Sequence, residues 1–168
     1  KIWTKCISDQ SELNVPISSR TEAWDFITNE LKAVAEVLPP TQPQDKTGRA
    51  TSGAANSYLG FAYLTRAYEE TAQKQTHLTE ALTALEKVKG YQLVKDYVSM
   101  FDGTNKNSTE AIFERQFSDN SANGAFYRTA LHYWMAASEL GGWDEILPTT
   151  MLMNEFKKEG KIATTGNY

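Results

Sequence analysis

The side chains best suited to ligand chemistry gather in one stretch of the carboxyl-terminal half of the chain. The densest aromatic cluster falls between residues 126 and 143, and amide, carboxylate and guanidinium groups lie among its rings. A flat ring can pack against the C–H face of a sugar, while polar groups at its edge bind the sugar hydroxyls. The candidate platforms are Trp143, Trp134, Tyr133 and Tyr127, and the candidate polar partners are Asn123, Arg128 and Asp144.

The neighbouring residues predict different environments for these aromatic side chains. Trp143 follows a Gly-Gly pair and precedes an aspartate, so its ring is expected on a non-helical loop, where it can contact a ligand. Tyr133 and Trp134 have Leu131 and Met135 as neighbours, and this apolar spacing fits buried packing as well as it fits ligand contact.

Other kinds of site are excluded by residue type or spacing. Residues 48–53 have the Gly-x4-Gly spacing of a phosphate loop, but alanines follow where that loop needs lysine and a hydroxyl. Residues 102–108 hold oxygen ligands, yet the glycine and glutamate of a calcium loop are misplaced. Asp144 and Glu145 are adjacent, so they point in different directions in most backbone conformations and do not form the carboxylate pair of a glycosidase. We therefore expect no catalytic residue, no metal and no cofactor.

The composition also narrows the class of partner. The chain has 168 residues and a net charge of -4, and its only adjacent basic pair is Lys157 and Lys158, which argues against a nucleic-acid groove. It has no run of about 18 apolar residues, so no transmembrane span of its own is expected. The single Cys6 cannot form an internal disulfide and has no Cys or His at metal-ligand spacing.

The scaffold that must position these residues is predicted to be helical. Ser19 and Glu22 have the spacing of a capping box, and two prolines at positions 39 and 40 end the helix that follows. Its apolar stripe is expected to be structural and consists of Trp24, Ile27, Leu31, Val34 and Leu38.

Residues 48–97 are predicted to form a helical hairpin. The first arm begins after Thr51 and Ser52, and its small residues permit close approach of a neighbouring helix. Its expected packing face is Ala55, Leu59, Ala62, Tyr63 and Arg66. The second arm is expected to end at Gly90 and to pack through Leu78, Ala81, Leu82, Leu85 and Val88.

The hairpin partly matches a tetratricopeptide repeat. Leu59, Gly60 and Tyr63 fit the first helix of that repeat, but the two halves lie about nine residues further apart than a repeat of about 34 residues allows. Residues 111–117 alternate as a strand would, and Pro148 and Thr149 are expected to open a last helix. The predicted class is all-α, with tetratricopeptide-like hairpins, irregular loops and at most a short β element.

Four stretches in order carry a resemblance to a known family. They are Leu-Pro at 38–39, Gly-Arg-Ala-Thr at 48–51 followed by Gly-Ala-Ala, Val-Lys-Gly-Tyr-Gln-Leu at 88–93, and Asn-Ser-Thr-Glu-Ala-Ile-Phe-Glu at 107–114. Together these stretches resemble the SusD/RagB family of surface glycan-binding lipoproteins from Bacteroidetes. Thr109 departs from the family pattern, in which serine is usual. The resemblance extends over about residues 20–160.

The resemblance implies a location and a partner as well as a fold. Such proteins are non-catalytic, are lipid-anchored on the outward face of the outer membrane, and deliver oligo- or polysaccharide to a SusC-like TonB-dependent transporter. Part of their aromatic arc corresponds to residues 120–147 here. The lipidated start of such a protein is absent from this sequence, which opens on Lys1, so the chain resembles an internal portion of a longer protein.

We expect one domain over residues 1–168. Within it, residues 20–102 are predicted to be tetratricopeptide-like helices, 103–147 a loop-rich aromatic segment, and 148–168 a helix and tail. Two functions remain open at this stage. The first is glycan capture, and the second is a tetratricopeptide-type scaffold that holds a protein partner against the exposed residues of the 54–67 helix.

Overall fold

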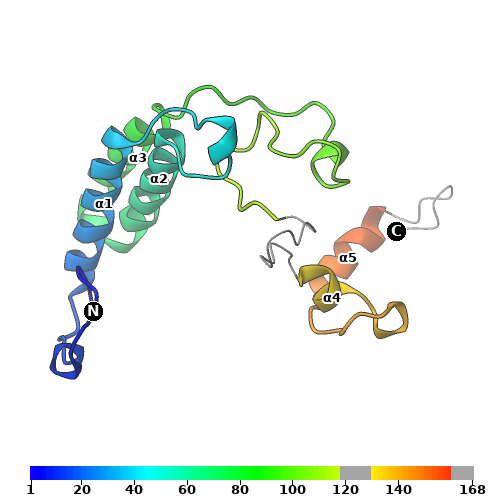
Figure 1. The fold of residues 1–168 in the computed structure, drawn as a ribbon, viewed down its shortest axis with the longest axis horizontal. Coiled ribbons are helices and arrows are strands. Elements are labelled where there is room, and N and C mark those ends of the chain that lie inside the picture. Colours follow the sequence, from blue (N-terminus) through cyan, green and yellow to red (C-terminus); the bar gives the residue numbers. More distant parts are fainter. Residues whose placement is uncertain (118–129, 160–168) are drawn as a thin grey trace. The chain divides into compact units, whose positions relative to one another are not determined.

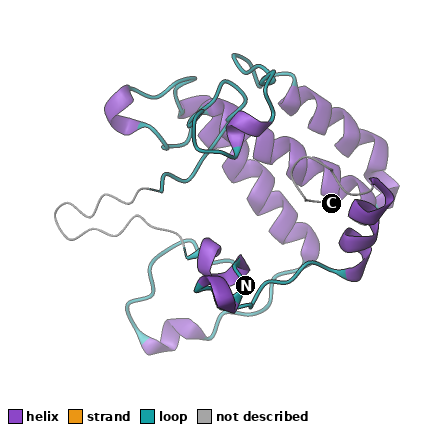
Figure 2. Cartoon of the chain, turned by 90° about the vertical axis from the view of Figure 1, so that its right-hand side faces the viewer, coloured by secondary structure: helices purple, strands orange, loops and turns teal. Residues whose placement is uncertain are grey.

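The computed structural model describes residues 1–117 and 130–159. The chain divides into two compact units, residues 1–116 and 117–168 (Figure 1). The described residues are helices, turns and loops without a strand, as Figure 2 shows. The all-α class expected from the sequence is therefore confirmed, whereas the division of residues 1–168 into segments of one domain stays a prediction.

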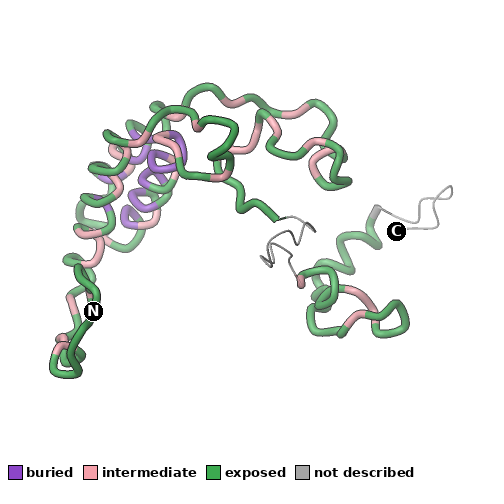
Figure 3. The backbone as a smooth tube through the Cα atoms, in the orientation of Figure 1, coloured by how far each residue is buried: buried purple, intermediate pink, exposed green. Residues whose placement is uncertain are grey.

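Three helices form the first unit. They are α1 (Arg20–Val37), α2 (Ser52–Glu69) and α3 (Lys74–Leu85), and α2 contacts both of the others. The short 3-10 turns η1 (Gln10–Leu13), η2 (Gln44–Lys46), η3 (Thr71–Gln73) and η4 (Val98–Met100) occupy the connections. Figure 3 shows that the buried positions gather along α2, so this central helix supplies most of the core.

The helix starts follow from local hydrogen bonding. The hydroxyl of Ser19 accepts from the Glu22 amide at 3.2 Å, and the Glu22 carboxylate accepts from the Ser19 amide at 2.7 Å, so the predicted capping box is confirmed. At the start of α2, Thr51 Oγ1 accepts from the Ala54 amide at 3.2 Å. Helix α1 ends at Val37 because the residue before Pro39 is pushed into extended backbone.

The predicted packing face of α2 is confirmed. All five of its residues are buried, and they are Ala55, Leu59, Ala62, Tyr63 and Arg66. The core is formed by Leu59 and Tyr63 with Ala81 and Ala84 from α3, and Leu31 of α1 packs against it. At Gly60 an added Cβ would lie 2.6 Å from Leu85 Cγ, so this glycine permits the close approach of α3.

The prediction for α3 is wrong in two respects. The helix ends at Leu85, before Gly90, although Gly90 does adopt the left-handed conformation at φ 88°. Its buried residues are His77, Ala81 and Ala84, whereas Leu82 and Leu85 are exposed. Ala81 was among the residues predicted to pack, and with Ala84 it lies against the large Leu59 and Tyr63 of α2. Leu85 lies beside Gly60, where α2 has no side chain.

The predicted strand at residues 111–117 is also absent. A strand needs hydrogen bonds to a second extended segment, and residues 111–117 have no such pairing. Instead, the Gln116 amide group pairs with the Asn107 amide group through hydrogen bonds of 2.8 and 3.1 Å. The alternating pattern therefore forms an extended loop that is fixed by side chains.

A buried charge network joins the three helices of the first unit. The Arg66 side chain, only 8 % exposed, donates from Nη1 to Asp25 of α1 at 2.8 Å and from Nε to Glu70 at 2.6 Å. Glu70 also accepts from Thr21 of α1 at 3.1 Å and from His77 of α3 at 3.2 Å. The hydrogen bond from Arg66 lowers the pKa of Glu70 below its usual value.

The predicted apolar stripe of α1 is packed only in part, because Ile27 and Val34 are exposed and Trp24 is half-buried. The indole N–H of Trp24 donates to Glu69 at 3.0 Å, which ties α1 to the end of α2.

The second unit contains short helices connected by loops. They are α4 (Leu131–Met135), η6 (Ser138–Leu140) and α5 (Thr150–Glu159). The predicted last helix is confirmed: it begins directly after Thr149, whose hydroxyl accepts from the Leu152 amide at 3.2 Å.

Glu70→Gln is expected to lower the free energy of unfolding near neutral pH by about 2 kcal/mol, because the buried Arg66 loses a charged partner. The folded-state pKa of Glu70 is lowered, so this stabilisation is present above the ordinary carboxylate pKa and is lost as pH falls through the folded value. Urea denaturation across this pH range measures it. The control Glu80→Gln breaks an exposed pair with Lys32 and should change stability little. A Glu70→Gln deficit independent of pH would contradict the network.

Gly60→Ala is expected to destabilise the protein by about 1–3 kcal/mol, although alanine is normally favoured in a helix by about 1 kcal/mol. The reason is the contact between the new methyl group and Leu85. Thermal unfolding of Gly60→Ala, Leu85→Ala and the double variant measures the coupling. Strict additivity of the two changes would show that the helices do not meet there.

Candidate functional site

Two of the predicted aromatic residues stack on each other in the second unit. The rings of Tyr133, on α4, and Trp143, on the loop after η6, have centroids 5.4 Å apart and planes 21° apart. A third ring, His132, lies 4.1 Å from Tyr133 with a tilt of 41°. The structure therefore brings residues ten positions apart in the sequence into one aromatic cluster.

The loop that carries Trp143 is held by the open end of α4. The last carbonyls of a helix lack partners within it, and here the returning loop supplies them. The Trp143 amide donates to the Tyr133 carbonyl at 2.7 Å, and the amides of Glu145 and Ile146 donate to the Trp134 carbonyl at 3.0 and 2.9 Å. The backbone of Trp143 is thus fixed against the residue on which its ring stacks.

Both glycines before Trp143 are needed by this arrangement, for different reasons. Gly141 has φ 85°, a left-handed conformation that suits glycine. Gly142 passes so close to the end of α4 that an added Cβ would overlap the Ala136 carbonyl oxygen. The sequence indicated flexible backbone here, but the structure shows a close approach of two backbone segments.

Asp144 helps to fix this loop through both its side chain and its backbone. Its carboxylate accepts from the Ser138 amide at 3.1 Å, and its own amide donates to the Ala136 carbonyl at 3.3 Å. Its φ of 53° lies in the left-handed region, which aspartate enters more readily than most residues. A role in positioning Trp143 therefore accompanies the predicted role at the edge of a ligand.

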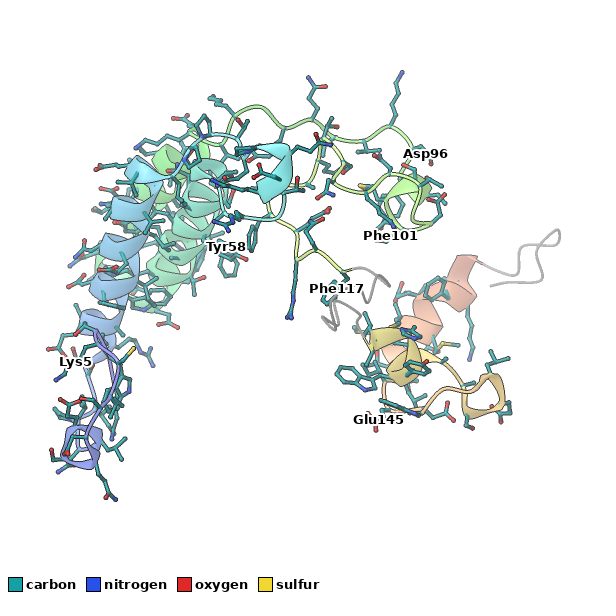
Figure 4. All side chains as sticks on the ribbon, in the orientation of Figure 1. Lys5, Tyr58, Asp96, Phe101, Phe117 and Glu145 are labelled. Carbon is teal, nitrogen blue, oxygen red and sulfur yellow. The ribbon has the colours of Figure 1, made fainter. Side chains whose placement is uncertain are left out.

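The aromatic side chains of this unit are open to solvent. Trp134 is 40 % exposed, Tyr133 46 % and Trp143 54 %, so neither Tyr133 nor Trp134 is the buried packing residue that its apolar neighbours also allowed. Both rings of the stacked pair therefore keep surface that a further contact can use. Figure 4 shows the side chains of this segment, with Glu145 labelled on the returning loop.

Some of the predicted site is not placed. Tyr127, Asn123 and Arg128 lie outside the described residues. Conversely, His132 belongs to the cluster but is not among the sequence candidates, because nothing in its spacing marked it apart from its place next to Tyr133.

Residues 1–117 and 130–159 meet neither the requirements of a metal site nor those of a membrane-spanning helix. No group of three His, Cys, Asp or Glu side chains is placed to hold a metal ion there. None of the helices in this part of the chain combines the length and apolarity needed to cross a membrane.

Comparison with known proteins gives a similarity among solved structures. No family model and no curated relative matches the chain. Among solved structures, the chain is similar to the crystal structure of a SusD-like protein from Bacteroides fragilis, with 29 % sequence identity, a TM-score of 0.55 and coverage of 73 % of this chain. The matched region is only 24 % of that protein's length. The chain is thus similar in helical fold and in sequence to a SusD-like protein, and it spans about a quarter of that protein's length.

Gly142→Ala is expected to separate Trp143 from Tyr133, because the new methyl group cannot coexist with the Ala136 carbonyl. The aromatic near-ultraviolet circular dichroism and tryptophan fluorescence should change, while the far-ultraviolet helix signal should remain. Gly141→Asn is the matched control, since asparagine tolerates the left-handed conformation and nothing lies within 4 Å of an added Cβ. Identical aromatic spectra for Gly142→Ala and the unmodified protein would contradict the geometry of this loop.

Proposed function

We propose that the chain is part of a non-catalytic glycan-binding protein of the bacterial cell surface. The observation that carries this proposal is the exposed Tyr133–Trp143 pair, stacked at 5.4 Å and held on a loop whose backbone is fixed to α4. Preorganised ring faces with polar groups at their edge fit a sugar, which presents C–H groups on its faces and hydroxyls on its rim. The SusD-like sequence and fold support the same class of function.

The energetics favour a binder of polymers over a binder of single sugars. Each aromatic platform contributes on the order of 1 kcal/mol beyond area burial, so two or three rings hold one chain end only weakly. A polysaccharide presents the same unit many times, and many copies of the protein on a surface convert weak contacts into firm retention.

The location and partner of the protein belong to the same proposal. A SusD-like protein on the outward face of the outer membrane, lipid-anchored through a region outside this chain, would deliver oligo- or polysaccharide to a SusC-like TonB-dependent transporter. The similarity to a SusD-like structure supports this placement.

A protein-interaction scaffold is the second candidate. The small residues Ala54, Ala62 and Ala67 of α2 are buried in the helix contacts and are unavailable to a partner. However, Tyr58 and Phe61 project from the same helix, at 56 % and 67 % exposure (Figure 4 labels Tyr58), and apolar grooves flank them. Phe61→Asp should abolish partner capture if this candidate is correct, and sugar should not compete.

Trp143→Ala is expected to weaken polysaccharide binding about fivefold, the equivalent of one ring platform of about 1 kcal/mol. Affinity electrophoresis of the full-length protein through gels with starch, xylan, mannan, β-glucan, pectin or mucin glycans measures it. Trp3→Ala is the control, because Trp3 is also an exposed tryptophan but lies in the other unit. Equal retardation of Trp143→Ala and the unmodified protein would overturn the proposed site.

A further inference from the structure

A cavity in the first unit is unused by the proposed aromatic site. It has a volume of about 340 Å³ and lies at the start of α2, between the loop that enters this helix, the turn at residues 89–91 and the loop at 107–114. The volume is at the lower end of the range for small-molecule sites, which limits an occupant to about one sugar ring.

The walls of the cavity are held in place by hydrogen bonds. Gln42 Nε2 donates to the Ala50 carbonyl at 2.6 Å, which closes the entering loop on itself. The hydroxyls of Thr51 and Tyr91 lie 3.2 Å apart, so the turn after α3 is tied to the start of α2. The paired amides of Asn107 and Gln116 close the third wall. The cavity is therefore formed before any ligand binds.

Glycine is required where two of these walls meet. Gly48 has φ 88°, and an added Cβ there would lie 2.5 Å from Gln116 Cγ. The loop entering α2 and the 107–116 loop approach closely at this point, so the absence of a side chain keeps the two walls together. Gly48 is the first glycine of the Gly-x4-Gly segment that does not fit a phosphate loop. This contact explains why a glycine stands at that position.

The charges that line the cavity favour a ligand with one negative charge. Arg49 and Lys89 both line it, and neither forms an ion pair within the part of the chain that the structure describes. Glu114 is the single carboxylate in the lining, so the cavity carries a net positive charge in a protein whose overall charge is -4. Both cations are exposed and hydrated, so their attraction for an anion is moderate and is screened by salt.

The uncharged lining favours a polyhydroxylated ligand. Some side-chain groups in the lining already bond within the walls but keep hydrogen-bonding capacity: Gln42 keeps its amide oxygen, Thr47 keeps the lone pairs of its hydroxyl, and Asn107 keeps a second amide N–H. Tyr91 and Phe113 offer aromatic surface. A simple inorganic anion would leave these groups and most of the volume unused. A neutral sugar would leave the two cations without a partner.

We propose that this cavity binds a uronic acid, as a free sugar acid or as a unit of an acidic glycan. Its carboxylate faces Arg49 and Lys89, and its hydroxyls face the amide and hydroxyl groups of the walls. The inference rests on the proposed glycan-binding function for its class of ligand, but its residues are all in the first unit and those of the aromatic platform are in the second.

Isothermal titration of the full-length protein with glucuronate, galacturonate and a trigalacturonide tests the proposal, with glucose and galactose as the neutral matches. At least one uronate ligand should bind about tenfold more tightly than its neutral match and should weaken as salt is raised. The free acids and the trimer distinguish a sugar acid from a glycan unit.

Arg49→Gln and Lys89→Gln should each weaken uronate binding at least about fivefold, whereas Lys46→Gln, an exposed neighbour outside the cavity, should leave it unchanged. Equal binding of acidic and neutral sugars, no uronate binding, or unaltered binding by both variants would overturn the proposal. If the cavity does not bind uronate, retardation of the protein by polysaccharide would still depend on Trp143. The experiments therefore distinguish failure of the uronate proposal from failure of the glycan-binding proposal.

Discussion

The buried guanidinium of Arg66 is the interaction on which the helical unit depends. Removing this charge from water is costly, and the cost is offset only while Asp25 and Glu70 both accept its hydrogen bonds. Because Thr21 of α1 and His77 of α3 also bind Glu70, the network contacts all three helices. These directional contacts therefore add specificity to the packing of the helices.

Loops in both units are fixed by the ends of helices, and the described residues contain no sheet that would support them. At the start of α2, Thr51 caps the helix and also meets the hydroxyl of Tyr91, which holds the wall of a cavity. At the end of α4, the carbonyls of Tyr133 and Trp134 receive the loop that carries Trp143. The ends of α2 and α4, with backbone groups that lack partners inside the helix, thus position the surfaces that we propose to bind sugar.

The sequence predicted those features that depend on residues three or four positions apart. The capping box of Ser19 is of this kind, and so is the buried face of α2, which packs between two other helices. The buried side of α3 was predicted only in part, because it depends on where Leu59 and Tyr63 of α2 project, and the alternation at 111–117 lacked a pairing partner. At the site, Trp143 stood out through its glycines, but its stacking on Tyr133 depends on a turn whose geometry no local pattern specifies.

The central claim is that the exposed rings of Tyr133 and Trp143 contact the C–H face of a sugar. Saturation-transfer NMR tests it directly, with aromatic protons of the full-length protein irradiated in the presence of oligosaccharides cut from the polysaccharide that retards it. The account predicts transfer to the ring C–H protons of the sugar and strong loss of that transfer in Tyr133→Ala and Trp143→Ala. Undiminished transfer in both variants would contradict it.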